Sequence, residues 1–368
     1  MKDYIFLLII FFVLGCKKTT TDNPIVPQDK EEVNVPVSKR KINLVYPSNG
    51  SSFRSGDEFQ IRYTLVDSIV EVDSVDVVFG DTRERLYHPA TSFKTDCRVR
   101  DLGDNMLKLD FYVNGKKETD RREIVVFSDI KPQNISYEVL NKFPHDDNAY
   151  TQGLEFVDGV LYESTGTYGK SDIRITDLEK GSIQKKVPLN GKFFAEGMTC
   201  FNGKVYQLTW KEQTYFTYDT KLEKKEKHTL PFDSEGWGIT HSDTELIMSN
   251  GSGDIYFINP ETFQVRKTLG IYTDSGPVKK LNELELVGDI LYANVYLSNE
   301  LMLIDVHTGK VLAIIDMKDL LPIAEFKQGH TDVLNGIAYN EKTNKLYVTG
   351  KNWPYVYEIK HSPIKKIN

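Results

Sequence analysis

The sequence has few of the residues that mark disulfide-rich folds, zinc sites or nucleic-acid-binding surfaces. Its 368 residues include three cysteines and seven scattered histidines, and no Cys/His cluster has zinc-site spacing. There are 46 basic and 53 acidic residues, so the formal net charge of −7 gives no argument for nucleic-acid binding. The remaining composition, 40% hydrophobic and 27% charged, is that of an ordinary globular protein.

Long apolar stretches are also missing, and the run at residues 4–14 is too short to span a bilayer as a stable anchor. After a charged start, this run predicts a signal peptide over residues 1–15. Residues 13–16 resemble the bacterial lipobox, which implies that Cys16 becomes the lipidated first residue after cleavage. The alternative is an ordinary signal peptide followed by an accidental cysteine.

Residues 16–40 are rich in Thr, Pro, Lys, Glu and Asp and have little to bury, so they predict a lipid-anchored flexible linker. Together with the signal peptide, this linker indicates an exported bacterial lipoprotein. We expect the protein to be held to a membrane through Cys16 and to face the periplasm or the cell exterior.

Residues 41–129 predict a small immunoglobulin-like β-sandwich. Residues 42–46 alternate between apolar and polar side chains and stop at Pro47. Further strand-like runs occupy residues 58–65, 72–79, 106–113 and 123–127. The segment has no group of residues typical of a catalytic site, so we expect it to act as a spacer or a docking domain. Cys97 lies here and Cys200 lies in the second domain, and two free thiols are a better interpretation than a disulfide between them.

Residues 133–368 contain five short segments that repeat one three-residue pattern. The first position varies, the second is glycine in four of the five segments, and the third is aliphatic or methionine. The glycine column is spaced by 41 to 53 residues, and each segment is followed by a polar stretch and another apolar run. This period is typical of a β-propeller blade. The fold class is therefore all-β, with a five-bladed β-propeller after the sandwich. The segments are Gln152-Gly153-Leu154, Glu196-Gly197-Met198, Trp237-Gly238-Ile239, Asn282-Glu283-Leu284 and Asn335-Gly336-Ile337.

The first residue of each segment forms a column of mostly amides with one carboxyl and one indole. The innermost strands of a propeller converge on one axis, so this column predicts a ring of side chains at one mouth of the central channel. Such a ring indicates a functional site. The last repeat has only three convincing strands, and we expect residues 135–140 to close the propeller as its fourth strand, because an unpaired edge is a liability.

With these residues in place, residues 143–360 resemble the glutaminyl cyclases of the plant and bacterial type, a family of five-bladed propellers. An ordered set of motifs carries the resemblance. The motifs are Tyr150-Thr151-Gln152-Gly153-Leu154, Glu163-Ser164-Thr165-Gly166, Phe194-Ala195-Glu196-Gly197-Met198-Thr199, Leu208-Thr209-Trp210-Lys211, Glu235-Gly236-Trp237-Gly238, Asn282-Glu283-Leu284-Glu285, Asn335-Gly336-Ile337-Ala338 and Val348-Thr349-Gly350-Lys351 with Trp353-Pro354.

The resemblance implies an intramolecular reaction in which the α-amine of an N-terminal glutamine attacks its own side-chain amide. Ammonia leaves and pyroglutamate remains, and no metal or organic cofactor is required. Glu196 aligns with the family's catalytic glutamate, and its neighbours Phe194 and Met198 should raise its pKa by desolvation. If Glu283 turns inward, it is a second candidate. Without the resemblance, a solvated turn residue is an equally good interpretation of Glu196.

Asn282 and Lys351 align with the residues that hold and polarise the amide carbonyl, and they complete the implied catalytic set. Gln152 is suited to bind the substrate's carboxamide or first peptide group. Trp210 and Trp237 match tryptophans that enclose the glutamine side chain, although packing between blades is the alternative. Further implied wall residues, two of which depart from the family, are Phe194, Tyr150 in place of a phenylalanine, and Tyr296 in place of a third tryptophan.

Three acids near the first and last blades, Asp146, Asp147 and Asp332, could supply oxygen ligands to a structural cation. Solvated loop acids are the preferred interpretation, so we assign no metal site. The sequence therefore favours an enzyme acting on peptides or proteins with N-terminal glutamine. The alternative is a non-catalytic, lipid-anchored propeller that binds peptide N-termini. A propeller lyase or quinone-dependent dehydrogenase would need a metal-ligand set or a cofactor stack, and the sequence has neither.

Overall fold

The computed structural model describes residues 40–66, 71–80, 82–97 and 102–365. Within these ranges the regular structure is almost entirely β, and its one helical element is a 3₁₀ turn, η1 (Ile323–Glu325). No helix in the described part of the chain is long and apolar enough to cross a membrane. Cys16 and the predicted signal peptide lie outside the described residues.

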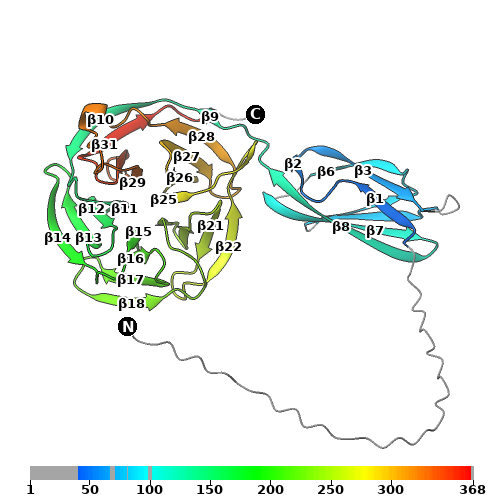
Figure 1. Ribbon diagram of the computed structural model, residues 1–368, viewed down its shortest axis with the longest axis horizontal. Helices are drawn as coiled ribbons and strands as arrows, with labels where there is room; N and C mark the ends of the chain where they lie inside the picture. The colour runs from blue at the N-terminus through cyan, green and yellow to red at the C-terminus, as the bar shows by residue number, and fades with distance from the viewer. Residues whose placement is uncertain (1–39, 67–70, 81, 98–101, 366–368) are drawn as a thin grey trace, which may run out of the picture. The chain divides into compact units, whose positions relative to one another are not determined.

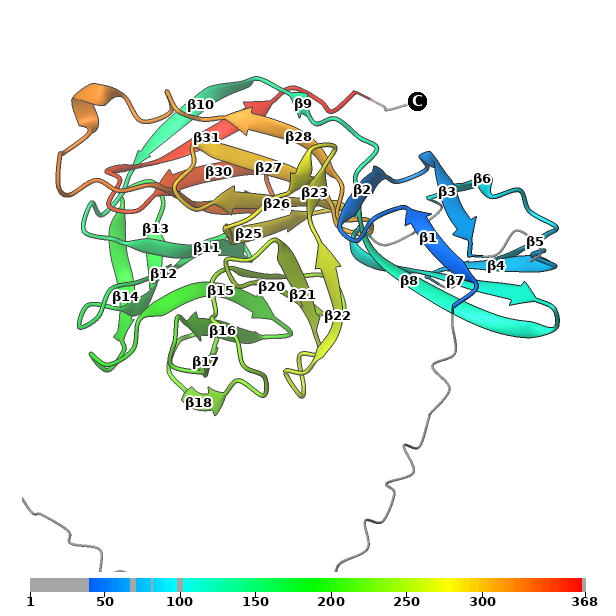
Figure 2. The ribbon, with the colours of Figure 1, turned by 45° about the vertical axis from the view of Figure 1, so that its right-hand side comes forward.

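The N-terminal strands form two sheets that share one hydrophobic core. The long hairpin of β7 and β8, clear in Figure 2, dominates the larger sheet. Alternating buried residues of both sheets, such as Ile61, Val75, Leu109 and Ile124, meet in a single cluster. One sheet has the order β1 (Ile42–Tyr46), β3 (Glu58–Leu65), β6 (Ser92–Asp96), and the other β2 (Ser51–Arg54), β8 (Lys116–Phe127), β7 (Gly103–Val113), β4 (Ser74–Phe79), β5 (Thr82–Tyr87).

Most of the remaining strands form five sheets, in which neighbouring strands are antiparallel apart from one added parallel strand. Three follow the chain in order: β11 (Thr151–Val157), β12 (Val160–Thr165), β13 (Asp172–Asp177), β14 (Ser182–Pro188); β15 (Ala195–Phe201), β16 (Lys204–Thr209), β17 (Thr214–Asp219), β18 (Lys225–Thr229); and β19 (Ile239–His241), β20 (Leu246–Ser249), β21 (Asp254–Ile258), β22 (Val265–Gly270). A small hairpin of β23 (Tyr272–Thr273) and β24 (Gly276–Pro277) follows the third.

The last two sheets include segments from before the first repeat. The fourth is β25 (Leu281–Val287), β26 (Ile290–Val295), β27 (Glu300–Asp305), β28 (Val311–Asp316), with β9 (Gln133–Asn134) added parallel to β28. The fifth is β10 (Tyr137–Pro144), β31 (Tyr355–His361), β30 (Lys345–Gly350), β29 (Leu334–Asn340). The expected closure of the last sheet by residues 135–140 is confirmed, although the pairing strand runs a few residues further, to Pro144.

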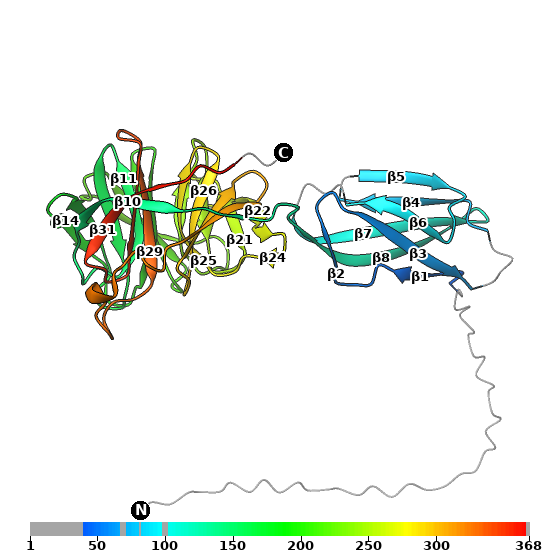
Figure 3. The same cartoon turned by 90° about the horizontal axis from the view of Figure 1, so that it is seen from above.

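The five sheets surround a common centre in a propeller-like arrangement (Figure 1). One edge strand of each sheet, such as β11, β15, β25 and β29, lies innermost, and these strands contact one another around the centre. Figure 3 shows β11 and β29 running across the thickness of this ring. Apolar clusters fill the spaces between neighbouring sheets, for example between the fourth and fifth.

The innermost strands share a local irregularity at the positions that the sequence pattern singled out. The pairing register shifts after Thr151 in β11, after Ala195 in β15, after Leu281 in β25 and after Leu334 in β29. Such bulges leave a residue outside the regular ladder and re-aim its side chain. The variable column of the repeats therefore coincides with the points where side chains are released from the sheets.

The glycines of the repeats are explained by close approach of these strands. A Cβ atom on Gly197 would lie 2.6 Å from the carbonyl oxygen of Trp237, and one on Gly238 would lie 2.0 Å from that of Asn282. Both distances are far below normal contact, so only glycine allows the backbones to come this close. The close approach draws successive members of the column together.

Candidate functional site

The five members of the variable column lie together at the starts of the innermost strands. The Gly197 N–H donates to the Trp237 carbonyl at 2.7 Å, and the Asn335 amide donates to the Gln152 side-chain oxygen at 3.3 Å. Gln152, Glu196, Asn282 and Asn335 are almost completely buried, and Trp237 is half-buried. The backbones at these positions therefore come close together, and the side chains of Gln152 and Asn335 are in contact.

Glu196 is a buried carboxyl whose pKa lies well above its ordinary value. Only 6% of the residue is exposed, and desolvation is the main cause of the raised pKa. The nearby Lys351 ammonium opposes this rise in pKa, whereas the carboxylates of Glu212 and Glu235 add to it. A carboxyl tuned in this direction is suited to exchange protons near neutral pH.

Lys351 follows β30 and is 3% exposed, although a lone lysine in a loop is usually solvated. Its Nζ lies over two aromatic faces, 4.9 Å from the Tyr150 ring centre and 5.2 Å from that of Tyr296. Burial lowers the pKa of Lys351, while Glu196 and Asp332 oppose that shift. The site thus brings a carboxyl with a raised pKa near an ammonium with a lowered pKa.

Asn282 is 2% exposed, and its side-chain oxygen Oδ1 has no hydrogen-bond partner among the described residues. An unpartnered buried polar atom costs free energy, of the order of 1–3 kcal/mol, and such atoms in native proteins often serve binding or catalysis. Oδ1 of the neighbouring Asn335 is unpartnered in the same part of the chain, since only its amide nitrogen is used. The ring therefore contains two unused acceptors.

The predicted aromatic wall residues contact one another in edge-to-face pairs. Ring centres are 5.6 Å apart for Trp210 and Phe194, 6.3 Å for Phe194 and Tyr150, and 5.6 Å for Tyr296 and Trp237. Lys351 joins the two tyrosines through its contacts with both rings. All five aromatic residues are half-buried, so each keeps a face that a ligand can reach.

Glu235 links Trp210 to Trp237 and so completes the series of contacts among the wall residues. Its Oε2 atom accepts a hydrogen bond from the Trp210 indole at 2.8 Å and another from the Trp237 indole at 3.0 Å. The sequence prediction missed Glu235 as a site residue, although it stands in the same motif as Trp237. The only available signal was its position two residues before Trp237, and spacing cannot reveal that it also reaches Trp210.

Glu283, the second carboxylate candidate, does turn inward, but its carboxylate is already engaged by the backbone. Its Oε1 accepts from the Leu154 N–H at 3.3 Å, and its Oε2 accepts from the Ile337 N–H at 2.9 Å. It therefore links β25 to β11 and β29. Burial raises the pKa of Glu283 well above its ordinary value, against the effect of these two donors. Both carboxylate oxygens of Glu283 are therefore already engaged.

The three acids considered as cation ligands are each used by protein groups. Asp146 pairs with the buried Arg174 at 2.8 Å, Asp147 pairs with Lys327, and Asp332 accepts the Tyr150 hydroxyl at 2.9 Å. No group of three or more His, Cys, Asp or Glu side chains suited to a metal ion occurs among the described residues. Cys97 and Cys200 are free thiols, as the sequence favoured.

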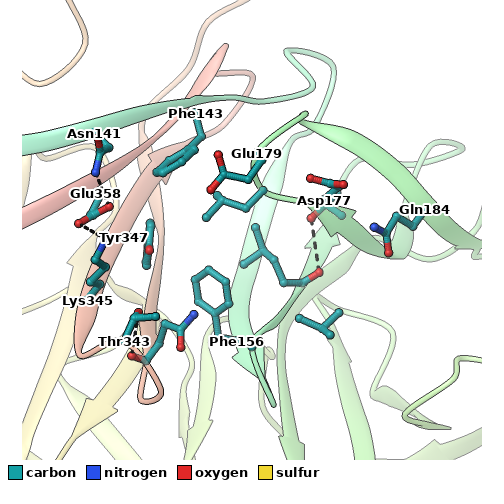
Figure 4. A pocket seen from close by; sticks show the side chains of 16 residues that line it. Asn141, Phe143, Phe156, Asp177, Glu179, Gln184, Thr343, Lys345, Tyr347 and Glu358 are labelled. Carbon is teal, nitrogen blue, oxygen red and sulfur yellow. Dashed lines mark hydrogen bonds and ion pairs between the residues drawn. The ribbon is translucent and has the colours of Figure 1, made fainter.

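Two cavities on the propeller-like part of the chain are lined by residues outside the predicted site. A cavity of about 570 Å³ lies between the first and fifth sheets (Figure 4). It is lined by the rings of Phe143, Phe156 and Tyr347 and by the ion pair of Lys345 with Glu358, whose atoms are 2.9 Å apart. A further cavity of about 920 Å³ lies where the innermost strands end. Neither holds a member of the ring.

Comparison with known proteins agrees with this geometry. The family model described as glutamine cyclotransferase matches residues 113–361. Glutaminyl-peptide cyclotransferase of Arabidopsis thaliana is 36% identical over 226 residues, which cover 61% of this chain and 70% of that protein. The crystal structure of Myxococcus xanthus glutaminyl cyclase superposes with a TM-score of 0.58 at 31% identity, over 63% of this chain and 99% of that one. The family model spans well over half of the chain, which therefore belongs to the glutamine cyclotransferase family.

Proposed function

We propose that this protein is a glutaminyl-peptide cyclotransferase, which converts N-terminal glutamine of peptides or proteins into pyroglutamate. The α-amine nitrogen forms a bond to the side-chain amide carbon, and the bond from that carbon to the amide nitrogen breaks. One proton leaves the amine and one proton reaches the departing nitrogen, so ammonia is released and nothing is oxidised or reduced. The single observation that carries the proposal is a buried carboxyl, amide and ammonium framed by a circuit of aromatic side chains.

Glu196 is the proposed proton carrier between the attacking amine and the leaving nitrogen. Its raised pKa suits both halves of this transfer, because the same group must accept a proton and then donate it. Asn282 and Lys351 are the proposed partners of the amide oxygen, on which negative charge develops as the ring closes. Fixed donors in a water-poor site stabilise such charge effectively.

The aromatic residues are the proposed walls for the glutamine side chain, and Gln152 is the proposed contact for its carboxamide or the first peptide group. The walls are Tyr150, Phe194, Trp210, Trp237 and Tyr296. Flat faces on several sides would hold the side chain bent toward the amine, and holding reacting groups in place lowers the barrier substantially. Mutual support among the rings reduces their freedom before the substrate arrives.

We further propose that the fold is a five-bladed β-propeller over residues 133–368, preceded by an immunoglobulin-like sandwich over residues 41–129. The sheet order supports the first assignment, and the two sheets around one core support the second. A fragment beginning at Ser128 should fold and retain cyclase activity. A soluble fragment without a cooperative thermal transition would contradict this division.

We also propose that the protein is an exported lipoprotein, anchored through Cys16 by a flexible segment over residues 16–40. The apolar run that ends at Gly15-Cys16 supports this proposal. Mass analysis of membrane-extracted protein should find an acylated Cys16 at its N-terminus. Cys16→Ala should release the protein from membranes, and continued lipid-dependent sedimentation of that variant would overturn the proposal.

The proposed reaction is tested directly by incubating the purified protein with a glutamine-led dipeptide. Ammonia and a product lighter by one ammonia should appear together, and the same peptide with an acetylated α-amine should not react. Binding of the dipeptide without either product would instead indicate the non-catalytic peptide binder.

A further inference from the structure

Two of the three tryptophans in the chain are held by the same carboxylate oxygen. Trp210 follows β16 and Trp237 precedes β19, so they belong to neighbouring sheets. Their indole nitrogens nevertheless converge on Oε2 of Glu235, at 2.8 and 3.0 Å. Oε1 of Glu235 lies 3.8 Å from Nζ of Lys211, which itself stacks over the Trp210 ring at 3.8 Å. One oxygen of the carboxylate therefore binds both indoles, and the other faces Lys211.

The segment that carries Glu235 is fixed to the segment that carries Trp210. The Gly236 N–H donates to the Trp210 carbonyl at 3.1 Å, and the Gln213 side chain donates to the Ser234 carbonyl at 2.8 Å. A Cβ atom on Gly236 would lie 2.7 Å from the Thr209 carbonyl oxygen, so the two segments are in close contact. Glu235 therefore occupies a defined position between the indoles.

We propose that Glu235 is a positioning residue that sets the separation and tilt of Trp210 and Trp237, and thereby the width of the pocket for the substrate's side-chain amide. This proposal rests on the proposed function, because it names what shapes the pocket of that same site. Hydrogen bonds to a charged acceptor are stronger than neutral ones, and here one acceptor restrains two rings. Without it, two indole N–H groups lose their partner and both rings regain rotational freedom.

Glu235 also carries a charge, and its effect must be separated from positioning. The charged groups acting on Glu196 are Lys351, Glu212 and Glu235, and loss of either carboxylate should lower the pKa of Glu196. Glu212 provides a matched control, because it accepts the Tyr168 hydroxyl at 2.9 Å and no indole. A Glu212→Gln variant should therefore change the pH dependence and leave the tryptophans in place.

The experiment combines indole NMR with steady-state kinetics on the full chain. The third tryptophan, Trp353, donates to the Asp332 carbonyl at 2.8 Å and serves as an internal reference. In Glu235→Ala and Glu235→Asp, two of the three indole N–H signals should move and the Trp353 signal should stay. Aspartate keeps the charge but is one methylene shorter, so it should not span both indoles.

The same comparison of the alanine, aspartate and glutamine variants at position 235 gives the expected kinetics. KM for a glutamine-led dipeptide should rise about tenfold in Glu235→Ala and Glu235→Asp, equivalent to about 1.4 kcal/mol, with kcat reduced much less. Glu235→Gln keeps the length and an acceptor oxygen, so its KM should stay within about threefold of wild type. Its acidic limb of kcat against pH should move to lower pH, as should that of Glu212→Gln.

Three outcomes would overturn the proposal. The first is unmoved Trp210 and Trp237 signals in Glu235→Ala. The second is a Trp353 signal that moves as far as the other two in Glu235→Ala or Glu235→Asp, and the third is an unchanged KM where the Trp210 and Trp237 signals have moved. The NMR result does not depend on turnover. A wild-type protein that does not cyclise glutamine would defeat the proposed function while the indole signals still report on Glu235.

Discussion

Replacing Glu196 by glutamine removes the proposed proton carrier with little change in volume. Glu196 is 6% exposed, and none of the described residues hydrogen-bonds its carboxylate, so the substitution breaks no hydrogen bond of this side chain within the described chain. General acid–base catalysis by a placed residue contributes about 10²–10⁴-fold, or roughly 3–5 kcal/mol of barrier. We expect kcat to fall by at least about 100-fold, the low end of that range. KM should change little, because the aromatic walls and Asn282 are untouched.

Glu283→Gln is the matched control for this prediction, since both glutamates are buried and lie in equivalent repeats. Glu283 holds the backbone N–H groups of Leu154 and Ile337, so its substitution should reduce the melting temperature. Turnover of the folded variant should stay within about tenfold of wild type. Ammonia release under saturating dipeptide measures both variants. If Glu196→Gln kept more than about a tenth of wild-type kcat while Glu283→Gln lost most of it, Glu283 would be the proton carrier.

Three further outcomes are expected. The profile of kcat against pH should be bell-shaped, with both limbs shifted toward neutral pH. Glu196 must lose its proton to act as base and has a raised pKa, whereas Lys351 must keep its proton and has a lowered pKa. A profile that stays flat down to pH of about 4, the ordinary range of a glutamate, would contradict this assignment. Asn282→Ala should reduce kcat by about 10²–10³-fold, as loss of an oxyanion donor does, in the ammonia-release assay. Arg174→Met should lower the free energy of unfolding by about 1–3 kcal/mol in denaturant titration, because the buried Asp172 carboxylate loses its bidentate partner and keeps only the ion pair with Lys186 at 2.8 Å.

The sequence predicted the sheets well because their signals are local. In the last sheet, the three strands expected from the last repeat and the closing strand expected from before the first repeat are all observed. The glycine column predicted where the innermost strands meet, since glycine is required wherever two backbones come that close. Strands β2, β5 and β6 were not predicted, because most of their side chains are exposed and lack a clear apolar alternation.

Contacts between segments far apart in the sequence could not be predicted from the sequence pattern. Trp210 and Trp237 were named as wall residues, but nothing in their spacing shows that both indoles meet one carboxylate oxygen of Glu235. The inward turn of Glu283 was left open for the same reason, because it depends on N–H groups of two other sheets. Such convergence is a property of the assembled ring, and a linear pattern records only the residues that take part.

The environment of Lys351 fits the proposed role of a buried ammonium beside a developing oxyanion. Among the described residues, no carboxylate lies within ion-pairing distance of its Nζ, and two tyrosine faces surround it instead. Cation–π contacts contribute about 0.5–2 kcal/mol each and stabilise the charge without a competing anion. Tyr296 makes both this contact and the edge-to-face contact with Trp237. It therefore presents an aromatic face that holds Lys351, and under the proposed function the positive charge remains available to the substrate's amide oxygen.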